Sequence, residues 1–229
     1  MDLERIYHKL IVSCQALEDE PLYSSFIMGR LAIAAKQGGA GGIRANSVAD
    51  IKEIKRHVDL PLIGIIKKNY SDSDIYITAT MKETKALVEQ TQAEIIAMDA
   101  TDRKRPSNEN IADLISFVHE HGRLAMADIS NLSEGILAEK LGFDLVSTTL
   151  SGYTAYTPKR DEPDFDLVKE LTARTKLPVI MEGHTTSPKQ VIHAFELGAY
   201  AVVVGGAITR PQQITERYTK EILNFKNRN

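Results

Sequence analysis

Short apolar runs recur along this chain, and each is followed by a stretch whose apolar residues have helical spacing. Most of the runs are continuous rather than alternating, which is typical of parallel strands covered on both faces. Each run gives way to a polar residue or to glycine. The pattern predicts eight β-then-α units, with strands at residues 10–14, 42–43, 62–66, 95–98, 124–127, 145–146, 179–181 and 201–204.

The boundaries of several helices can be predicted from their terminal residues. Thr80 and Glu83 have the spacing of a capping box, which predicts that a helix begins after Thr80. Ser187 precedes Pro188, and this pair favours the start of a helix. Gly142 follows a helical stretch, where glycine favours the left-handed conformation that ends a helix.

Eight βα units in one domain predict a closed (β/α)8 barrel of the TIM-barrel type. The 229 residues of the chain divide into about 29 residues per unit, near the size of one βα repeat. The alternative is a doubly wound open sheet, which typically has five or six strands and a glycine fingerprint after the first. Here the first run ends at Cys14 and Gln15 with no glycine nearby. We therefore predict an α/β fold in which residues 1–229 form a single barrel domain.

Composition narrows the class of protein further. No stretch is apolar over the roughly 18 residues that a membrane span needs, and the first ten residues are too polar for a signal peptide. The single cysteine, Cys14, fits a reducing compartment, and a net charge of −3 gives no basic field for nucleic acid. We expect a cytoplasmic protein that binds neither membrane nor nucleic acid.

In a barrel of this kind, reactive groups collect where the strands end. The residues that end the eight apolar runs are therefore candidates for one pocket, and two long polar segments, 69–77 and 152–163, are candidates for loops over it. These strand-end residues are Gln15, Arg44, Lys67, Asp99, Asp128, Ser147, Glu182 and the pair Gly205 and Gly206.

The last two strand ends are typical of a phosphate site. Glycines at 183, 205 and 206 let backbone N–H groups approach phosphate oxygens, and barrels often bind phosphate after strands seven and eight. Arg210 would add a forked, charge-assisted contact. The plainer interpretation of Gly205 and Gly206 is a tight turn with no ligand.

Lys67 is the candidate nucleophile or base. Nearby positive charge from Lys68 and Arg44, together with partial burial, predicts a lowered pKa for its amine. A neutral lysine can act as a general base or form a Schiff base. The alternatives are a lysine that neutralises phosphate or one that lies on the surface.

The carboxylates are more ambiguous. Glu182 and Asp128 each end an apolar run, where an unpaired charge is costly, so a partner such as Lys67 or a substrate hydroxyl is expected for Glu182. A structural ion pair explains either residue equally well. Asp99 is a weaker candidate, because it is well placed to cap its own loop. Gln15 and Arg44 can hydrogen-bond a sugar, or they can fill the barrel as a polar layer.

Metal chemistry is not expected. His119 and His121 lie two residues apart at the end of a predicted helix, so they do not share a face. His184 is the histidine nearest the predicted rim, and one histidine with scattered carboxylates does not make a zinc or iron site.

Eight segments of the chain closely resemble the N-acetylmannosamine-6-phosphate 2-epimerase family, in family order over residues 13–211. They are SCQALEDEPL, GGIRANSVADI, PLIGIIKKNY, YITAT, MADIS, VSTTLSGYT, EGHTTSP and VVVGGAITRP. The resemblance implies an isomerase of amino-sugar and sialic acid breakdown that inverts C2 of an N-acetylhexosamine 6-phosphate. It also implies a cytoplasmic homodimer that uses no cofactor and no metal.

The resemblance assigns roles residue by residue. Lys67 of the GIIK motif is the catalytic base, and Arg44, Asp128 and Glu182 complete the catalytic set. The other implied assignments are substrate binding by Gln15, Tyr153, Thr154 and Arg210, and phosphate binding by Gly183, Gly205 and Gly206. At position 184 we would expect arginine as readily as the histidine present, which leaves the role of that side chain open.

The mechanism expected from these roles is proton transfer at C2 of the open-chain sugar, through an enolate. A one-base version uses Lys67 alone, and a two-base version adds Glu182. Two other functions stay open: a class I aldolase with Lys67 as the Schiff base, and a phosphosugar-binding barrel without catalysis.

The last predicted helix, residues 212–225, has apolar residues on one face. Ile214, Tyr218, Ile222 and Leu223 recur at helical spacing. This face either closes the chain's own barrel or packs on a second subunit.

Overall fold

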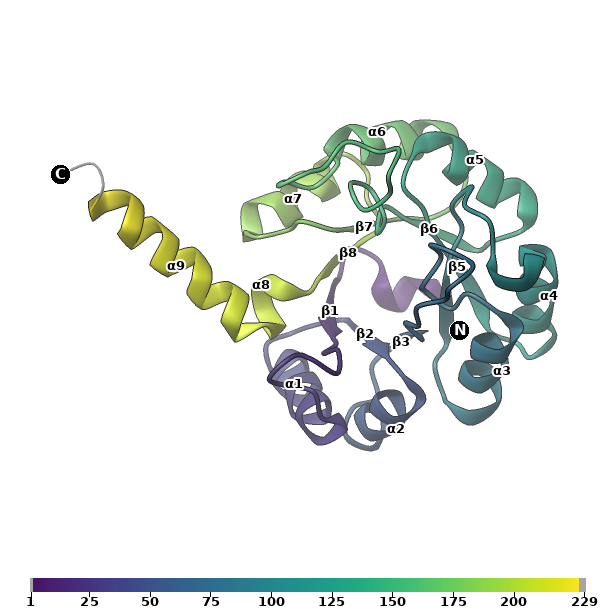
Figure 1. Cartoon of the computed structure of the whole chain (residues 1–229), viewed down its shortest axis with the longest axis horizontal. Coiled ribbons are helices and arrows are strands. Elements are labelled where there is room, and N and C mark those ends of the chain that lie inside the picture. The colour runs from purple at the N-terminus through teal and green to yellow at the C-terminus, as the bar shows by residue number, and fades with distance from the viewer. Residues whose placement is uncertain (1, 227–229) are drawn as a thin grey trace.

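Eight parallel strands close into one barrel in the computed structural model, which describes residues 2–226 (Figure 1). Each strand pairs with its neighbours in chain order, and the first pairs with the last. The predicted (β/α)8 fold is therefore confirmed. The strands are β1 (Leu10–Cys14), β2 (Gly42–Asn46), β3 (Leu62–Ile65), β4 (Ile95–Asp99), β5 (Leu124–Asp128), β6 (Leu145–Ser147), β7 (Val179–Glu182) and β8 (Ala201–Val204).

Seven helices alternate with the strands and surround the barrel (Figure 1). They are α1 (Ser25–Gln37), α2 (Val48–His57), α3 (Met81–Gln90), α4 (Ile111–Glu120), α5 (Leu132–Leu141), α6 (Phe165–Arg174) and α7 (Pro188–Glu196). The capping box predicted at Thr80 is present, and Gly142 caps α5 in the left-handed conformation at φ 88°. Pro188 is the first residue of α7, as predicted.

Two apolar layers hold the barrel together. Alternate strand residues such as Ile11, Ile63 and Ile180 fill its interior, where Ile6 of the short helix η1 (Leu3–Ile6) joins them. The residues between them, such as Val12, pack outward against the helices. A side chain two residues further along a strand therefore returns to the interior, and this alternation brings polar strand-end residues into the barrel.

The second strand is longer than its apolar run. We expected it to end at Arg44, but β2 continues to Asn46, and Arg44 lies at the level of Ser13 in β1 and Ile63 in β3. The strand can continue past Arg44 because this residue contacts the carboxyl groups of Asp128 and Glu182 inside the barrel.

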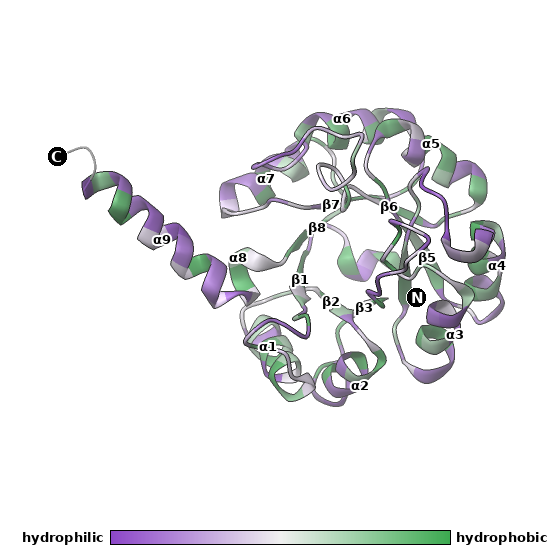
Figure 2. Cartoon of the chain, viewed as in Figure 1, coloured by the Kyte–Doolittle hydropathy of each residue, from purple (hydrophilic) through white to green (hydrophobic). Residues whose placement is uncertain are grey.

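The C-terminal segment departs from the repeating pattern. After β8 the chain forms only the four-residue helix α8 (Gly206–Thr209), and then α9 (Pro211–Lys226) extends away from the barrel (Figure 1). No residue of α9 is buried. Apolar and polar residues alternate along this helix, which extends away from the barrel (Figure 2). The possibility that this helix closes its own barrel is wrong. Within residues 2–226, no helix is long and apolar enough to cross a membrane.

Candidate active site

A cavity of about 410 Å³ lies at the C-terminal ends of the strands. It brings together most of the predicted site residues: Gln15, Arg44, Lys67, Tyr153, Glu182, Gly183, Gly205, Gly206 and Arg210. Two residues of the implied catalytic and substrate-binding set do not line it, nor do the strand-end candidates Asp99 and Ser147. Asp128 is fully buried beside Arg44, and the Thr154 hydroxyl pairs with that of Thr157 inside the loop after β6.

Arg44 is the centre of a buried ionic network. Its Nη2 lies 2.5 Å from Oδ2 of Asp128, and its Nη1 lies 3.0 Å from Oδ1 of Asp128 and 2.9 Å from Oε2 of Glu182. The ion-pair partner of Glu182 is therefore Arg44 rather than the expected Lys67. Burial alone would lower the pKa of Arg44, but the two carboxylates raise it, so the guanidinium stays charged.

Burial and a neighbouring positive charge act in opposite directions on the pKa of the Glu182 carboxyl. Burial raises its pKa above the ordinary value for glutamate, while the charge of Arg44 opposes that shift. The carboxylate belongs to β7 and lines the cavity, so it is both hard to ionise fully and within reach of a ligand. Such a group is suited to exchanging a proton.

Thr149 is a site residue that the strand-end pattern missed. Its hydroxyl lies 2.7 Å from Oδ1 of Asp128 and 3.3 Å from Oε2 of Glu182, and it lines the cavity. A hydroxyl has one proton to donate, so it serves one carboxylate at a time. The strand-end pattern led only to Ser147, because Thr149 lies in the turn after β6. The hydroxyls of the two residues lie 2.8 Å apart.

Lys67 has the lowered pKa that its surroundings predicted. Burial and the charge of Arg44 lower the pKa of its amine to about 8. Its backbone N–H donates to Oδ1 of Asn46 at 2.8 Å, which ties the residue to the end of β2. A substantial fraction of this amine is therefore neutral near physiological pH, as a general base requires.

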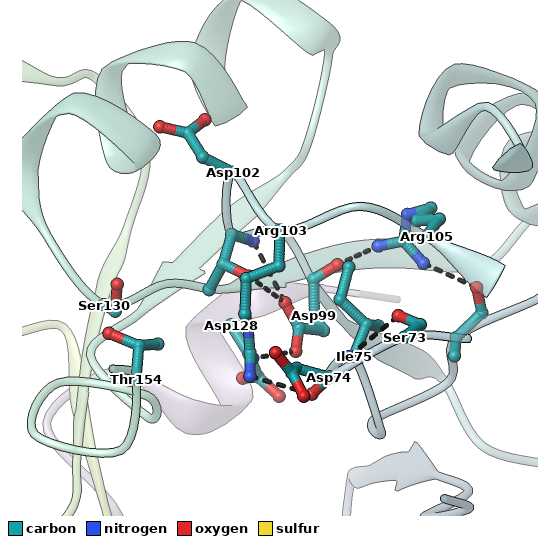
Figure 3. Close-up of polar contacts among 12 residues, drawn as sticks. Ser73, Asp74, Ile75, Asp99, Asp102, Arg103, Arg105, Asp128, Ser130 and Thr154 are labelled. Atoms are coloured by element: carbon teal, nitrogen blue, oxygen red, sulfur yellow. Dashed lines mark hydrogen bonds and ion pairs between the residues drawn. The ribbon is translucent and has the colours of Figure 1, made fainter. Parts of the chain in front are cut away.

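The loop after β3, which we expected to cover the pocket, is fastened to the loop after β4. Arg103 donates to the carbonyl of Asp74, and Arg105 donates to the carbonyls of Ala79 and Asp99 (Figure 3). Asp99 caps its own loop through Thr101 and does not line the cavity. These contacts position Tyr76 and Ile77, which form part of the cavity wall.

The glycine-rich end of the cavity is suited to an anion. Gly183 adopts a φ of 109°, a conformation that a side chain would strain, and it adjoins His184 at the cavity wall. The His184 ring stacks on Tyr153 at a centroid distance of 4.7 Å. Its Nε2 is buried and has no hydrogen-bond partner among the residues that the structure describes. Arg210 lies across this end, next to Gly205.

The C-terminal helix also reaches the cavity. Gln213 and Arg217, one helical turn apart at the start of α9, are among the lining residues. The sequence pattern did not single them out, because their approach to the cavity depends on the direction in which α9 leaves the barrel. Gln213 lies directly beside Gly206.

The two histidines of the HxH pair, His119 and His121, make structural contacts. His119 Nε2 lies 2.8 Å from Oδ2 of Asp144, and His121 Nδ1 lies 2.9 Å from the carbonyl of Phe117. Across residues 2–226, no group of three or more histidine, cysteine, aspartate or glutamate side chains is arranged to hold a metal.

Comparison with known proteins gives a consistent result. Residues 28–224 match the model of the family described as "Putative N-acetylmannosamine-6-phosphate epimerase". A relative from Clostridium perfringens with the description "Putative N-acetylmannosamine-6-phosphate 2-epimerase" is 63% identical over 217 residues, covering 95% of this chain and 98% of the relative. A relative of the same description from Clostridioides difficile is 56% identical, covering 96% and 98%.

Solved structures agree with the sequence relatives. The N-acetylmannosamine-6-phosphate 2-epimerase from Clostridium perfringens superposes with a TM-score of 0.94 at 62% identity, over 95% of this chain and 95% of that one. Thiamine phosphate pyrophosphorylase from Pyrococcus furiosus reaches a TM-score of 0.60 at 15% identity, which is a likeness of fold alone.

Proposed function

The chain belongs to the N-acetylmannosamine-6-phosphate epimerase family, and we propose that it interconverts N-acetylmannosamine 6-phosphate and N-acetylglucosamine 6-phosphate. The observation that carries this proposal is the Lys67 amine, whose pKa is lowered to about 8, in a cavity that ends in a glycine-rich wall and Arg210. The enzyme is then an isomerase, an N-acylglucosamine-6-phosphate 2-epimerase. It acts in the cytoplasm, in the breakdown of amino sugars such as sialic acid.

The reaction proceeds by proton transfer at C2 of the open-chain aldehyde. The C2 proton is acidified by the adjacent C1 carbonyl, so its removal leaves an enolate rather than a localised carbanion. Neutral Lys67 takes this proton, and the resulting ammonium returns it to the opposite face after the enolate has turned. This sequence is balanced by proton transfer alone, so it needs no cofactor and no metal.

Arg44, held in place by its carboxylate partners, stabilises the negative charge that develops on O1. The guanidinium is fixed by two aspartate contacts, so its charge is already oriented before the substrate arrives. Preorganised charge of this kind contributes several kcal/mol to transition-state stabilisation. Asp128 acts through Arg44, because it does not reach the cavity, whereas Glu182 can contact the sugar and assist ring opening.

The glycine-rich end of the cavity binds the phosphate. Gly183 and Gly205 leave room for a close approach to the backbone, Gly206 lines the same end beside the Gln213 side chain, and Arg210 supplies positive charge. Gln15 and Tyr153 are placed to contact the sugar. Thr154 supports this wall indirectly, through its bond to Thr157.

Isotope exchange tests this function. In D2O, we expect N-acetylmannosamine 6-phosphate to give N-acetylglucosamine 6-phosphate with deuterium at C2, because the amine exchanges its proton with solvent. Proton NMR of the C2 signal measures the exchange. Complete retention of protium in the product would contradict exchangeable proton transfer, and absence of turnover would favour a binding barrel without catalysis.

A class I aldolase is the second candidate, because a neutral lysine amine also forms Schiff bases. Borohydride reduction in the presence of a keto-acid substrate would then leave a covalent adduct on Lys67. We expect no increase in mass on treatment with borohydride, as measured by mass spectrometry of the intact chain.

We also propose that the protein is a homodimer held by α9. Tyr218, Ile222 and Leu223 are 72%, 54% and 58% exposed, so the helix offers an apolar face that its own barrel does not cover. A second copy offers the matching surface by symmetry. We expect Ile222→Glu to sediment as a monomer at concentrations where the native chain sediments as a dimer. Lys220→Glu, on the polar face, is the control that should remain dimeric.

A further inference from the structure

Glu20 and Arg210 form an ion pair between the loop after β1 and the residue that joins α8 to α9. The two residues are 190 positions apart in the chain. On the basis of the function proposed above, we propose that Glu20 is a positioning residue of the phosphate site. It holds the Arg210 guanidinium so that one amino group faces the phosphate.

The pairing uses one edge of the guanidinium. Arg210 Nε lies 2.5 Å from Oε1 of Glu20, and Nη2 lies 3.1 Å from Oε2, so the two side chains meet as a fork. Both are only 17% exposed. This geometry leaves Nη1 outside the ion pair.

The remaining amino group faces the glycine-rich wall. Nη1 lies 3.9 Å from the position that a Cβ would occupy on Gly205, and Arg210 and Gly205 both line the cavity. Nη1 is therefore the part of Arg210 that lies beside the glycine-rich wall, where the function proposed above places the phosphate. An arginine without Glu20 would be free to turn among its rotamers and would lose conformational entropy when phosphate binds.

Glu20 is itself held in place. Its Oε2 accepts from the backbone N–H of Leu17 at 2.7 Å, and its Oε1 accepts from Nε2 of Gln212 at 3.3 Å. The hydrogen bonds from Arg210 lower the pKa of the Glu20 carboxyl, so it is ionised at neutral pH. The carboxylate therefore anchors Arg210 from a fixed point on the first loop.

A competing interpretation predicts that Glu20 weakens phosphate binding instead of strengthening it. A carboxylate beside the site also repels an anion, so Glu20 would weaken phosphate binding if it merely occupied Arg210 in the absence of ligand. The free Nη1 favours positioning, because the pairing edge and the edge toward Gly205 are different parts of the same guanidinium.

The test is Glu20→Gln in the full chain, with Glu18→Gln as the matched control. Glu18 lies in the same loop and is exposed, so its change removes the same charge without touching Arg210. We expect Glu20→Gln to raise the KM for N-acetylmannosamine 6-phosphate and the Kd for inorganic phosphate by about tenfold, the worth of one charge-assisted contact. The kcat should stay within about twofold of the native value, since the reacting groups are not changed.

A double-mutant cycle tests whether Glu20 acts through Arg210. Arg210→Lys removes the fork, so adding Glu20→Gln to it should produce little further loss. Unchanged or tighter phosphate binding in Glu20→Gln would overturn the proposal, as would an equal loss in Glu18→Gln or a full further loss in the Arg210→Lys background.

Two further measurements keep the result independent of folding and of turnover. Glu20→Asp keeps the charge, but its side chain is too short to contact both Nε and Nη2 of Arg210. It should therefore also weaken phosphate binding, and it replaces Glu20→Gln as the test variant if Glu20→Gln does not fold. Calorimetry with inorganic phosphate needs no reaction, so a native chain that binds phosphate without epimerising sugar would contradict the proposed function while still testing Glu20.

Discussion

Lys67→Ala is expected to lower kcat by about a thousandfold, the usual contribution of a general base. The substitution removes the amine but leaves the glycine-rich wall and Arg210 in place, so phosphosugar binding should persist. Turnover by NMR and binding by calorimetry measure the two properties separately. Lys68→Ala is the control, because its neighbouring amine is 49% exposed and lies near Glu83 rather than in the cavity.

The pH dependence of turnover tests the same assignment of Lys67 as the base. The active form of Lys67 is the neutral amine, whose pKa is lowered to about 8. The kcat/KM of the native chain should therefore rise as pH increases and level off above about 8. A near-native rate in Lys67→Ala, or a rate that falls over this pH range, would contradict the assignment of the base.

Arg44→Met should produce the largest loss of stability, about 3–5 kcal/mol in the free energy of unfolding, since it leaves buried carboxylates without their counter-charge. Asp128 is fully buried, and Glu182 is only 15% exposed, so water cannot replace the guanidinium. Turnover should also fall, because the charge that stabilises O1 is lost.

The loss of stability in Arg44→Met should be greater at high pH than at low pH. Burial already raises the pKa of Glu182, and the charge of Arg44 opposes this shift. Without Arg44 the folded-state pKa of Glu182 rises further, so the folded chain binds a proton that the unfolded chain releases. The destabilisation should be smaller near pH 5 than near pH 8 in denaturant titrations. Arg56→Met is the control: its guanidinium is 73% exposed and pairs with Glu53 on the surface, so the change should be small at both pH values. Equal stability of native chain and Arg44→Met at pH 8 would contradict the role of the network.

Much of the barrel and its site could be predicted because strand residues alternate strictly between interior and exterior. Lys67 and Glu182 end their apolar runs at positions whose side chains face the interior of the barrel, so the hydropathy pattern was enough to identify them as candidates. Arg44 was found for a partly wrong reason, since its strand does not end there. What hydropathy could not indicate was which charges pair, because Asp128 lies 84 residues from Arg44.

Loop contacts were beyond the sequence pattern for a related reason. The fastening of the 69–77 loop by Arg103 and Arg105 uses backbone carbonyls, which every residue possesses, so no side-chain pattern marks the acceptors. The partner of Arg210 lies at the other end of the chain. The direction of α9 depends on the four-residue helix before it, where the eight-unit pattern had predicted a regular repeat.

The path of α9 has an evolutionary consequence. Its first turns carry Gln213 and Arg217 to the wall of the cavity. Its later turns extend away from the barrel (Figure 1) and carry the exposed apolar residues Tyr218, Ile222 and Leu223. If α9 also holds the proposed dimer, natural selection on ligand recognition and selection on self-association fall on the same 16 residues. A lineage that altered one of these traits would have to adjust the other within a single continuous helix.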